Sequence, residues 1–140
     1  MEWLFIKPLR DEKMIDQFEQ KVGYRFPLVF RECVMKNNGG NVEPDCFDTQ
    51  KEEGKVFNRL FSFDPADRGS MWVMALPADE EEAAAMKNYV PFADSPNGDP
   101  ICFDRRDDSI VCVDHETLEV EYVAPSFQAF LDKLYSDEDE

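Results

Sequence analysis

The chain has 140 residues, of which 43% are hydrophobic and 13% aromatic, and this composition predicts one folded domain over residues 1–140. It carries 31 acidic and 15 basic residues, so its formal net charge is −16. That charge argues against a nucleic-acid-binding protein, which needs a basic surface to replace phosphate counterions, and against docking on an anionic membrane.

The first 40 residues predict two helices that form an N-terminal pair. Asp11 is suited to cap the first helix, which apolar residues at helical spacing extend to about Lys21. Pro27 suits the first turn of a second helix, which covers residues 28–36. The sequence Asn37-Asn38-Gly39-Gly40 then predicts a stop and a tight turn.

Short elements separated by turns are predicted between residues 41 and 88. Residues 41–54 are polar and contain Pro and Gly, which predicts a loop with one short strand. Residues 55–63 alternate well enough to predict a single strand. Ser70 is suited to cap a turn, and Pro77 to open a helix. The first turns of that helix hold four acids that the helix dipole favours: Asp79, Glu80, Glu81 and Glu82.

Short apolar runs after residue 88 predict a group of paired strands. They cover residues 89–93, 101–104, 110–114 and 120–124. Their connections are short, so neighbouring strands are expected to pair antiparallel. Ser126 is suited to cap a last helix, whose apolar stripe includes Phe127 and Phe130.

Together these elements predict an α+β fold. In this fold a central antiparallel sheet of about five to six strands packs against the N-terminal helical pair and the C-terminal helix. The acidic end of the chain, residues 136–140, is expected to fray into solvent.

The N-terminus does not have the pattern of a signal peptide. It carries an acid, Glu2, where a signal peptide has bases, and its apolar stretch over residues 3–6 is too brief. The apolar runs elsewhere are too short to span a bilayer. We therefore expect a cytoplasmic protein whose four cysteines are reduced thiols.

No strong catalytic or metal-binding motif is present. The single histidine, His115, lies between two acids, which a general acid or base could use. Consecutive strand residues point to opposite faces, so a structural hydrogen bond in a turn is the favoured role. Cys102 and Cys112 could lie opposite one another in a hairpin, but zinc needs four ligands. We expect a non-catalytic protein without metal or cofactor; an enzyme that uses a carboxylate with His115 is the alternative.

The negative charge is concentrated in the later part of the chain. Residues 1–36 have a net charge of +1, whereas the remaining 104 residues have one of −17. Such a field steers a basic partner and suppresses non-specific association. We therefore expect acids of the later chain to contact a protein partner. The candidates are Asp79, Glu80, Glu81, Glu82, Asp107, Asp108, Glu116, Glu119 and Glu121.

Four motifs, in order along the chain, resemble the SUKH superfamily, the domain of fungal Knr/Smi-type regulators and many bacterial immunity proteins. These are an early helix followed by Phe26-Pro27, a second helix that ends in Asn37-Asn38-Gly39-Gly40, the segment 89–104, and the segment 110–131. Residues 41–88 do not align with the family pattern. The motif residues that we expect to be structural are Pro27, Asn38, Gly39, Gly40, Asn97, Gly98, His115, Phe127 and Phe130. Among them, the three glycines suit turns with positive φ and the two phenylalanines suit core packing.

The resemblance implies an α+β fold and a non-catalytic binding role. Bacterial members are typically immunity proteins that neutralise a cognate toxin, and many such toxins are nucleases with basic clefts. An acidic surface could block such a cleft as a nucleic-acid mimic. The resemblance also leaves open an adaptor or regulator that binds another cytosolic protein.

Overall fold

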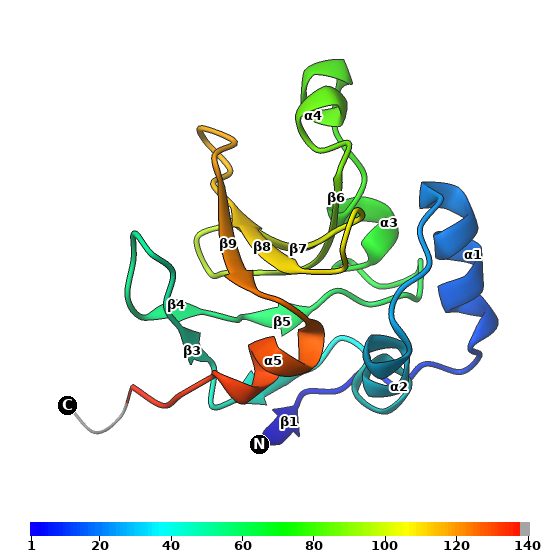
Figure 1. The fold of residues 1–140 in the computed structure, drawn as a ribbon. Coiled ribbons are helices and arrows are strands. Elements are labelled where there is room, and N and C mark those ends of the chain that lie inside the picture. The colour runs from blue at the N-terminus through cyan, green and yellow to red at the C-terminus, as the bar shows by residue number, and fades with distance from the viewer. Residues whose placement is uncertain (138–140) are drawn as a thin grey trace.

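The computed structural model describes residues 1–137, which fold around a five-stranded antiparallel sheet (Figure 1). Residues 138–140 of the expected acidic tail lie outside the described residues. The sheet has the order β5-β6-β7-β8-β9. Its strands are Arg59–Leu60, Tyr89–Asp94, Pro100–Asp104, Ile110–Val113 and Val120–Ala124. Short turns join β6 to β9 in sequence, and each of these strands pairs antiparallel with the next, as the sequence predicted.

Two smaller ladders lie beside this sheet. The strand β1 (Glu2–Leu4), which the sequence pattern did not predict, pairs with β2 (Asn41–Glu43). The strand β3 (Cys46–Phe47) pairs with β4 (Lys55–Val56). The predicted continuous strand over residues 55–63 is wrong, because β4 pairs with β3 whereas β5 pairs with β6. A chain that changes partners between two ladders bends, and it loses the regular alternation of faces.

The helices lie on two sides of the sheet. Their bounds are α1 Lys13–Val22, α2 Leu28–Asn37, α3 Met71–Met74, α4 Glu80–Ala85 and α5 Phe127–Asp132. Figure 1 shows α2 and α5 together below the sheet, while α4 projects at the top of the view. The predicted α+β architecture is therefore confirmed. None of the helices within residues 1–137 combines the length and the apolar composition that a bilayer span requires.

The N-terminal helical pair is fixed by Glu19, which is nearly buried. Its carboxylate accepts a hydrogen bond from the Phe26 amide at 2.7 Å and another from the Arg31 guanidinium at 2.8 Å. Arg31 also binds Asp16 on α1 and Glu12 at its N-cap. One guanidinium on α2 therefore binds two acids of α1 and its N-cap residue, which fixes the two helices against one another.

The turn after α2 depends on glycine for two different reasons. Gly39 has φ +70°, as predicted, a conformation that a side chain rarely adopts. The prediction of positive φ is wrong for Gly40, whose constraint is space: an added Cβ would lie 2.9 Å from the Asn37 carbonyl oxygen. Asn38, which lies between α2 and these glycines, is buried, and its side chain makes three hydrogen bonds to two segments of the chain, at Lys7 and at residues 62–63.

Phenylalanine rings join the helices to the sheet in one apolar core. The ring centroid of Phe30 on α2 lies 5.0 Å from those of Phe103 on β7 and Phe127 on α5. Phe130 stacks on Phe57 at 5.4 Å. The predicted core role of Phe127 and Phe130 therefore agrees with their burial, and the Ser126 hydroxyl accepts a hydrogen bond from the Ala129 amide at the start of α5.

Candidate functional site

The two faces of the sheet differ, because side chains alternate along each strand. One face contributes Ile101, Phe103 and Ile110 to the main core. The other, which we call the outer face, carries a second and smaller apolar cluster. Its members are Cys102, Val111 and Val113, with Met86, Tyr89 and Leu118 partly buried against them. This cluster lies on the side of the sheet away from α5, so the main core does not cover it.

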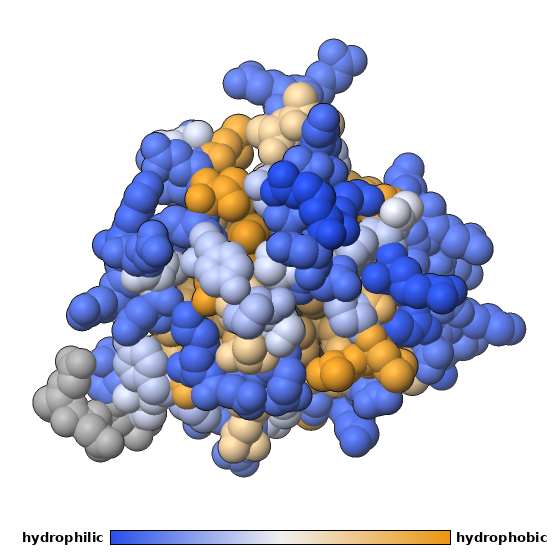
Figure 2. All heavy atoms as spheres, viewed as in Figure 1, coloured by the Kyte–Doolittle hydropathy of each residue, from blue (hydrophilic) through white to orange (hydrophobic). Residues whose placement is uncertain are grey.

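A groove of about 460 Å³ crosses the outer face. One side of its lining comes from the segment between Met74 and Pro91, which includes α4. The other side includes His115, Glu116 and Leu118 of the β8–β9 turn. Figure 2 shows hydrophobic atoms at the surface between this turn and α4. We call this feature the α4 groove.

The predicted acidic helix borders the α4 groove. Pro77 precedes it as expected, but α4 begins at Glu80, and Asp79 is its N-cap: the Asp79 carboxylate accepts a hydrogen bond from the Glu82 amide at 2.8 Å. Glu82 accepts one in return from the Ala78 amide. Asp79, Glu81 and Glu82 line the groove, whereas Glu80 does not.

The acids of the β7–β8 turn lie outside the α4 groove. Asp107 accepts a hydrogen bond from the Ser109 amide at 3.0 Å. Asp108 has φ +62° and accepts a hydrogen bond from the Tyr24 hydroxyl at 2.6 Å. Burial, together with this bond, raises the pKa of Tyr24 well above its ordinary value. Both acids therefore hold a turn, and Asp108 also joins it to the segment after α1.

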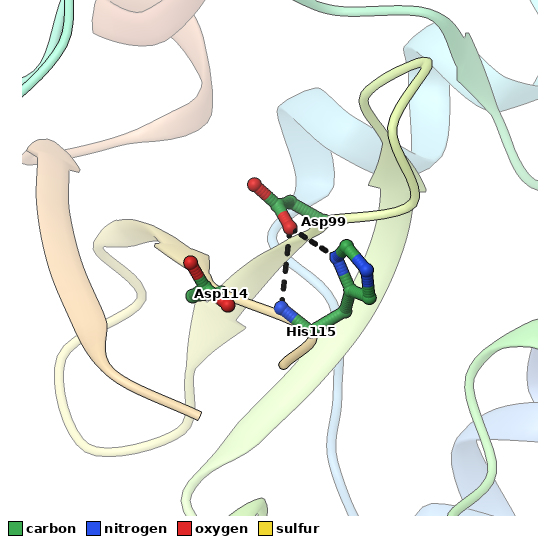
Figure 3. Close-up of side chains that lie close together, drawn as sticks. All are labelled: Asp99, Asp114 and His115. Carbon is green, nitrogen blue, oxygen red and sulfur yellow. Dashed lines mark hydrogen bonds and ion pairs between the residues drawn. The ribbon is translucent and has the colours of Figure 1, made fainter. Parts of the chain in front are cut away.

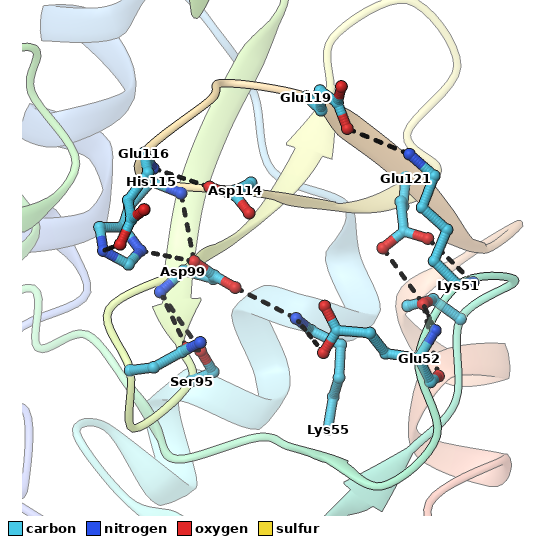
Figure 4. Close-up of polar contacts among 12 residues, drawn as sticks. Lys51, Glu52, Lys55, Ser95, Asp99, Asp114, His115, Glu116, Glu119 and Glu121 are labelled. Carbon is cyan, nitrogen blue, oxygen red and sulfur yellow. Dashed lines mark hydrogen bonds and ion pairs between the residues drawn. The ribbon is translucent and has the colours of Figure 1, made fainter.

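The remaining predicted contact acids, on and beside β9, bind the loop before β4. Lys51 forms an ion pair with Glu119 at 3.1 Å. The Glu121 carboxylate accepts hydrogen bonds from the Lys51 amide and the Thr49 hydroxyl. Figure 4 shows these contacts beside the network around Asp99. Four of the nine predicted acids therefore line the groove: Asp79, Glu81, Glu82 and Glu116.

His115 is fixed in the β8–β9 turn by one buried carboxylate, Asp99 (Figure 3). The same oxygen of Asp99 lies 2.7 Å from His115 Nδ1 and 3.1 Å from its backbone nitrogen. The imidazole, which is 44% exposed, lines the α4 groove. Its Nε2 atom lies 3.6 Å from a carboxylate oxygen of Glu116. The hydrogen bond to Asp99 raises the pKa of His115.

Lys55 neutralises Asp99 from the opposite side (Figure 4). Its Nζ atom lies 3.1 Å from the second carboxylate oxygen of Asp99, and both side chains are about 5% exposed. A carboxylate oxygen of the exposed Glu52 lies 3.5 Å from the same Lys55 ammonium. Burial alone would raise the pKa of Asp99, but the bonds from His115 and Lys55 outweigh it and hold that pKa below its usual value. The result is a series of contacts that runs from the exposed Glu52 through Lys55 and Asp99 to His115 at the groove.

The cluster of Asp99, Asp114 and His115 places one ligand atom of each within 4.8 Å, a spacing that could hold a metal ion (Figure 3). Three of its four carboxylate oxygens already have partners. Asp99 binds His115 and Lys55, and one oxygen of Asp114 accepts the amide hydrogens of Glu116 and Thr117. The Lys55 ammonium already supplies the positive charge that a cation would bring. We therefore interpret the cluster as a turn-forming network.

The cysteine arrangement differs from the predicted one. Residue Ile101, and not Cys102, pairs with Cys112, so the two thiols point to opposite faces of the sheet. Burial raises the pKa of both thiols, that of Cys112 to about 12. A buried protonated thiol is a poor nucleophile and a poor metal ligand. The groove lining within residues 1–137 contains no Ser, Thr or Cys that His115 could deprotonate.

We expect the stability of the protein to depend on pH through His115. The His115 pKa is raised above its ordinary value of 6.5, so the protonated imidazole stabilises the fold fully below pH 6.5, and this contribution is lost as the pH rises through the folded-state pKa. The charged neighbours that face the ring are Asp99, Asp114 and Glu116. The measurement is the urea midpoint between pH 5.5 and 8.5, with His115→Gln as the control. An equal slope in that variant would contradict this assignment.

Sequence reasoning missed Lys55 and gave Asp99 no role in the site. The two residues are 44 positions apart, and Asp99 reaches the interior only because the β6–β7 turn folds back on itself. In that turn the Ser95 hydroxyl donates to Asn97, and the Ser95 amide donates to the Asp99 carbonyl at 3.0 Å. Gly98 has φ +93°, as predicted for this turn. The one sequence feature that could have pointed to Asp99 is its position directly after Asn97-Gly98. Because this arrangement is common in ordinary turns, it does not indicate a buried ion pair.

Comparison with known proteins gives one family. The family model described as SMI1 / KNR4 family (SUKH-1) matches residues 11–133, which include α1, α5 and the whole sheet between them. No curated protein matches the chain. The match begins near the N-cap of α1 and ends directly after α5, and so it covers the elements that build the groove and the Asp99 network.

Proposed function

The chain belongs to the SMI1/KNR4 family (SUKH-1), and on that premise we propose that it is an immunity protein that binds and neutralises a cognate toxin. Bacterial members of this family typically have that role. Neutralisation by occlusion needs a stable surface that is complementary to the toxin, and it requires no catalytic group on the immunity protein. The alternative within the same family is an adaptor for another protein.

One observation carries this proposal: exposed acids stand beside a groove whose lining includes the partly buried apolar residues Leu76, Met86 and Leu118. The side chains of Glu80 and Glu81 make no hydrogen bond or ion pair within residues 1–137, so their charges face solvent. The β8–β9 turn adds Glu116, and the apolar floor includes Val113 and Leu118. Charged groups at a rim guide a partner, and a desolvated apolar centre supplies affinity.

A basic toxin domain, of nuclease type, fits this surface best. A nuclease holds phosphates in a basic cleft, and the net charge of −17 after residue 36 is complementary to such a cleft. A hydrogen bond from an amide or hydroxyl donor adds no positive charge, so the acids that are bonded in this way still count in the net charge of the surface. They therefore add to the field that steers the toxin towards the surface.

The decisive experiment is co-expression with each toxin gene that neighbours the gene for this chain. We expect wild-type protein to restore growth against one of them. Combined Glu80→Lys, Glu81→Lys and Glu116→Lys should slow association by about tenfold or more at low salt, because steering is lost. The measurement is the association rate between 50 and 500 mM salt.

The matched control reverses three exposed acids of the N-terminal half: Glu2→Lys, Glu32→Lys and Glu43→Lys. It changes the net charge by the same amount but leaves the outer face intact. Wild-type protein that rescues growth against no neighbouring toxin would overturn the immunity role and favour the adaptor. Equal rates for the two triple variants would place the contact elsewhere on the molecule.

A further inference from the structure

The helix α4 is anchored mainly at its ends, and its C-cap Met86 is partly buried against the apolar cluster of the outer face. It has six residues and buries none of them. Isolated helices of this length are unstable in water, because nucleation costs more than so few hydrogen bonds return. The N-cap Asp79 and the return contact of Glu82 with the Ala78 amide hold its first turn. A helix placed in this way forms a wall of the α4 groove without filling it.

The helix α4 lines the groove with two acidic side chains, Glu81 and Glu82, and one small apolar side chain, Ala83. Ala83 lines the groove, and Ala84, the next residue, does not. Leu76, Pro77 and Met86 extend the apolar lining at the two ends of the helix. The short side chain of Ala83 leaves room in the groove for a side chain that another molecule would insert.

The charge of the groove lining determines which residues of the partner can lie next to the inserted apolar side chain. Five acids line the groove: Asp79, Glu81, Glu82, Asp94 and Glu116. Three basic side chains oppose them: Lys87, Arg105 and His115. The Arg105 guanidinium is already engaged, because it donates to the Val22 carbonyl at 2.6 Å and to that of Gly23. The groove therefore presents an acidic rim around an apolar floor.

We infer that the α4 groove takes one segment of the toxin, in which an apolar side chain is flanked by arginine or lysine. The inference rests on the proposed function and adds the chemistry of the contact. The apolar side chain lies between Ala83 and the cluster of Val113 and Leu118, and the flanking bases meet Glu81 and Glu116. Burial of a leucine-sized side chain in such a site strengthens binding by about tenfold or more.

The test uses a synthetic peptide, so that it does not depend on finding the toxin. The probe is the acetylated and amidated pentapeptide Arg-Leu-Arg-Leu-Arg, titrated into the ¹⁵N-labelled full chain. We expect amide shifts confined to residues 81–91 and 113–118. A peptide with serine in place of leucine should bind about tenfold more weakly, and one with glutamate in place of arginine should produce no shifts.

Matched variants separate the groove from the rest of the surface. Ala83→Phe fills the groove and should weaken peptide binding about tenfold, whereas Ala84→Phe, on the same helix outside the lining, should leave it unchanged. Likewise Glu81→Lys should weaken binding more than Glu32→Lys on α2 does. Both alanines are exposed, so neither variant disturbs the core.

Two results would overturn the inference: shifts that lie outside the groove, or equal binding by Ala83→Phe and Ala84→Phe. Either result leaves the immunity proposal standing, because growth rescue by the wild-type chain is measured separately. Conversely, peptide binding in the groove without rescue by any neighbouring toxin would support the groove chemistry while overturning the immunity role.

Discussion

Replacing Lys55 with methionine is expected to lower the free energy of unfolding by about 3 to 5 kcal/mol. Lys55 and Asp99 are both nearly inaccessible, and their charged atoms are 3.1 Å apart. Methionine has a similar volume but no charge, so the variant leaves the Asp99 carboxylate buried with only His115 to compensate it. The measurement is urea denaturation at pH 7. Stability of the variant should fall further above the pKa of His115, where that ring loses its charge.

Two further variants show whether the buried charge is the cause. Lys51→Met removes an exposed lysine that also forms an ion pair at 3.1 Å, with Glu119, and it should cost less than about 1 kcal/mol. Adding Asp99→Asn to Lys55→Met removes the uncompensated charge, so the double variant should be more stable than Lys55→Met alone. A double variant that is less stable than Lys55→Met would show that loss of packing, and not the buried charge, dominates.

Replacing Asn38 with alanine is the second change for which we expect a large effect, about 1 to 3 kcal/mol for each buried group left without a partner. The Asn38 amide nitrogen donates to the Lys7 carbonyl and to the Ser62 hydroxyl, both at 2.9 Å. Its oxygen accepts a hydrogen bond from the Phe63 amide at 2.9 Å. Because the side chain is 1% exposed, water cannot replace these partners without opening the structure.

The adjacent Asn37 provides the control. It lies at the end of α2, is partly exposed, and donates to the Cys33 carbonyl at 3.1 Å. Asn37→Ala should therefore cost much less than Asn38→Ala in the same thermal or urea denaturation. Equal losses in the two variants would mean that the helix end, and not the three-way bond of Asn38, determines the stability of this turn.

Local patterns along the chain predicted most of the architecture. Helical spacing gave α1, α2 and α5, since apolar residues three or four positions apart fall on one side of a helix. Short turns between β6 and β9 predicted antiparallel pairing, since a short connection can only reverse the chain. The family resemblance, drawn from motifs in the same segments, is confirmed by the match over residues 11–133. Helices and short turns depend on residues that are close to one another in the sequence, so they could be predicted without the structure.

The predicted acids show where local reasoning ends. Their number and their position along the chain were plain from the sequence, but their partners were not. Asp108 binds Tyr24, which lies 84 positions earlier, and Glu121 binds the loop at Thr49. Only Glu80 and Glu81 among the nine lack a side-chain hydrogen bond or ion pair within the described residues. A charge pattern gives the field of the protein, whereas the partner of each charge depends on the fold.

The sequence by itself determined the fold class, the excess of negative charge and the positions of the turns. Only the tertiary structure decided that Lys55 meets Asp99, that His115 faces a groove, and that α4 stands away from the sheet. The physical reason is the range of the interactions. Helical periodicity and turn conformation act over a few residues, but a buried ion pair or a groove forms where distant segments pack together.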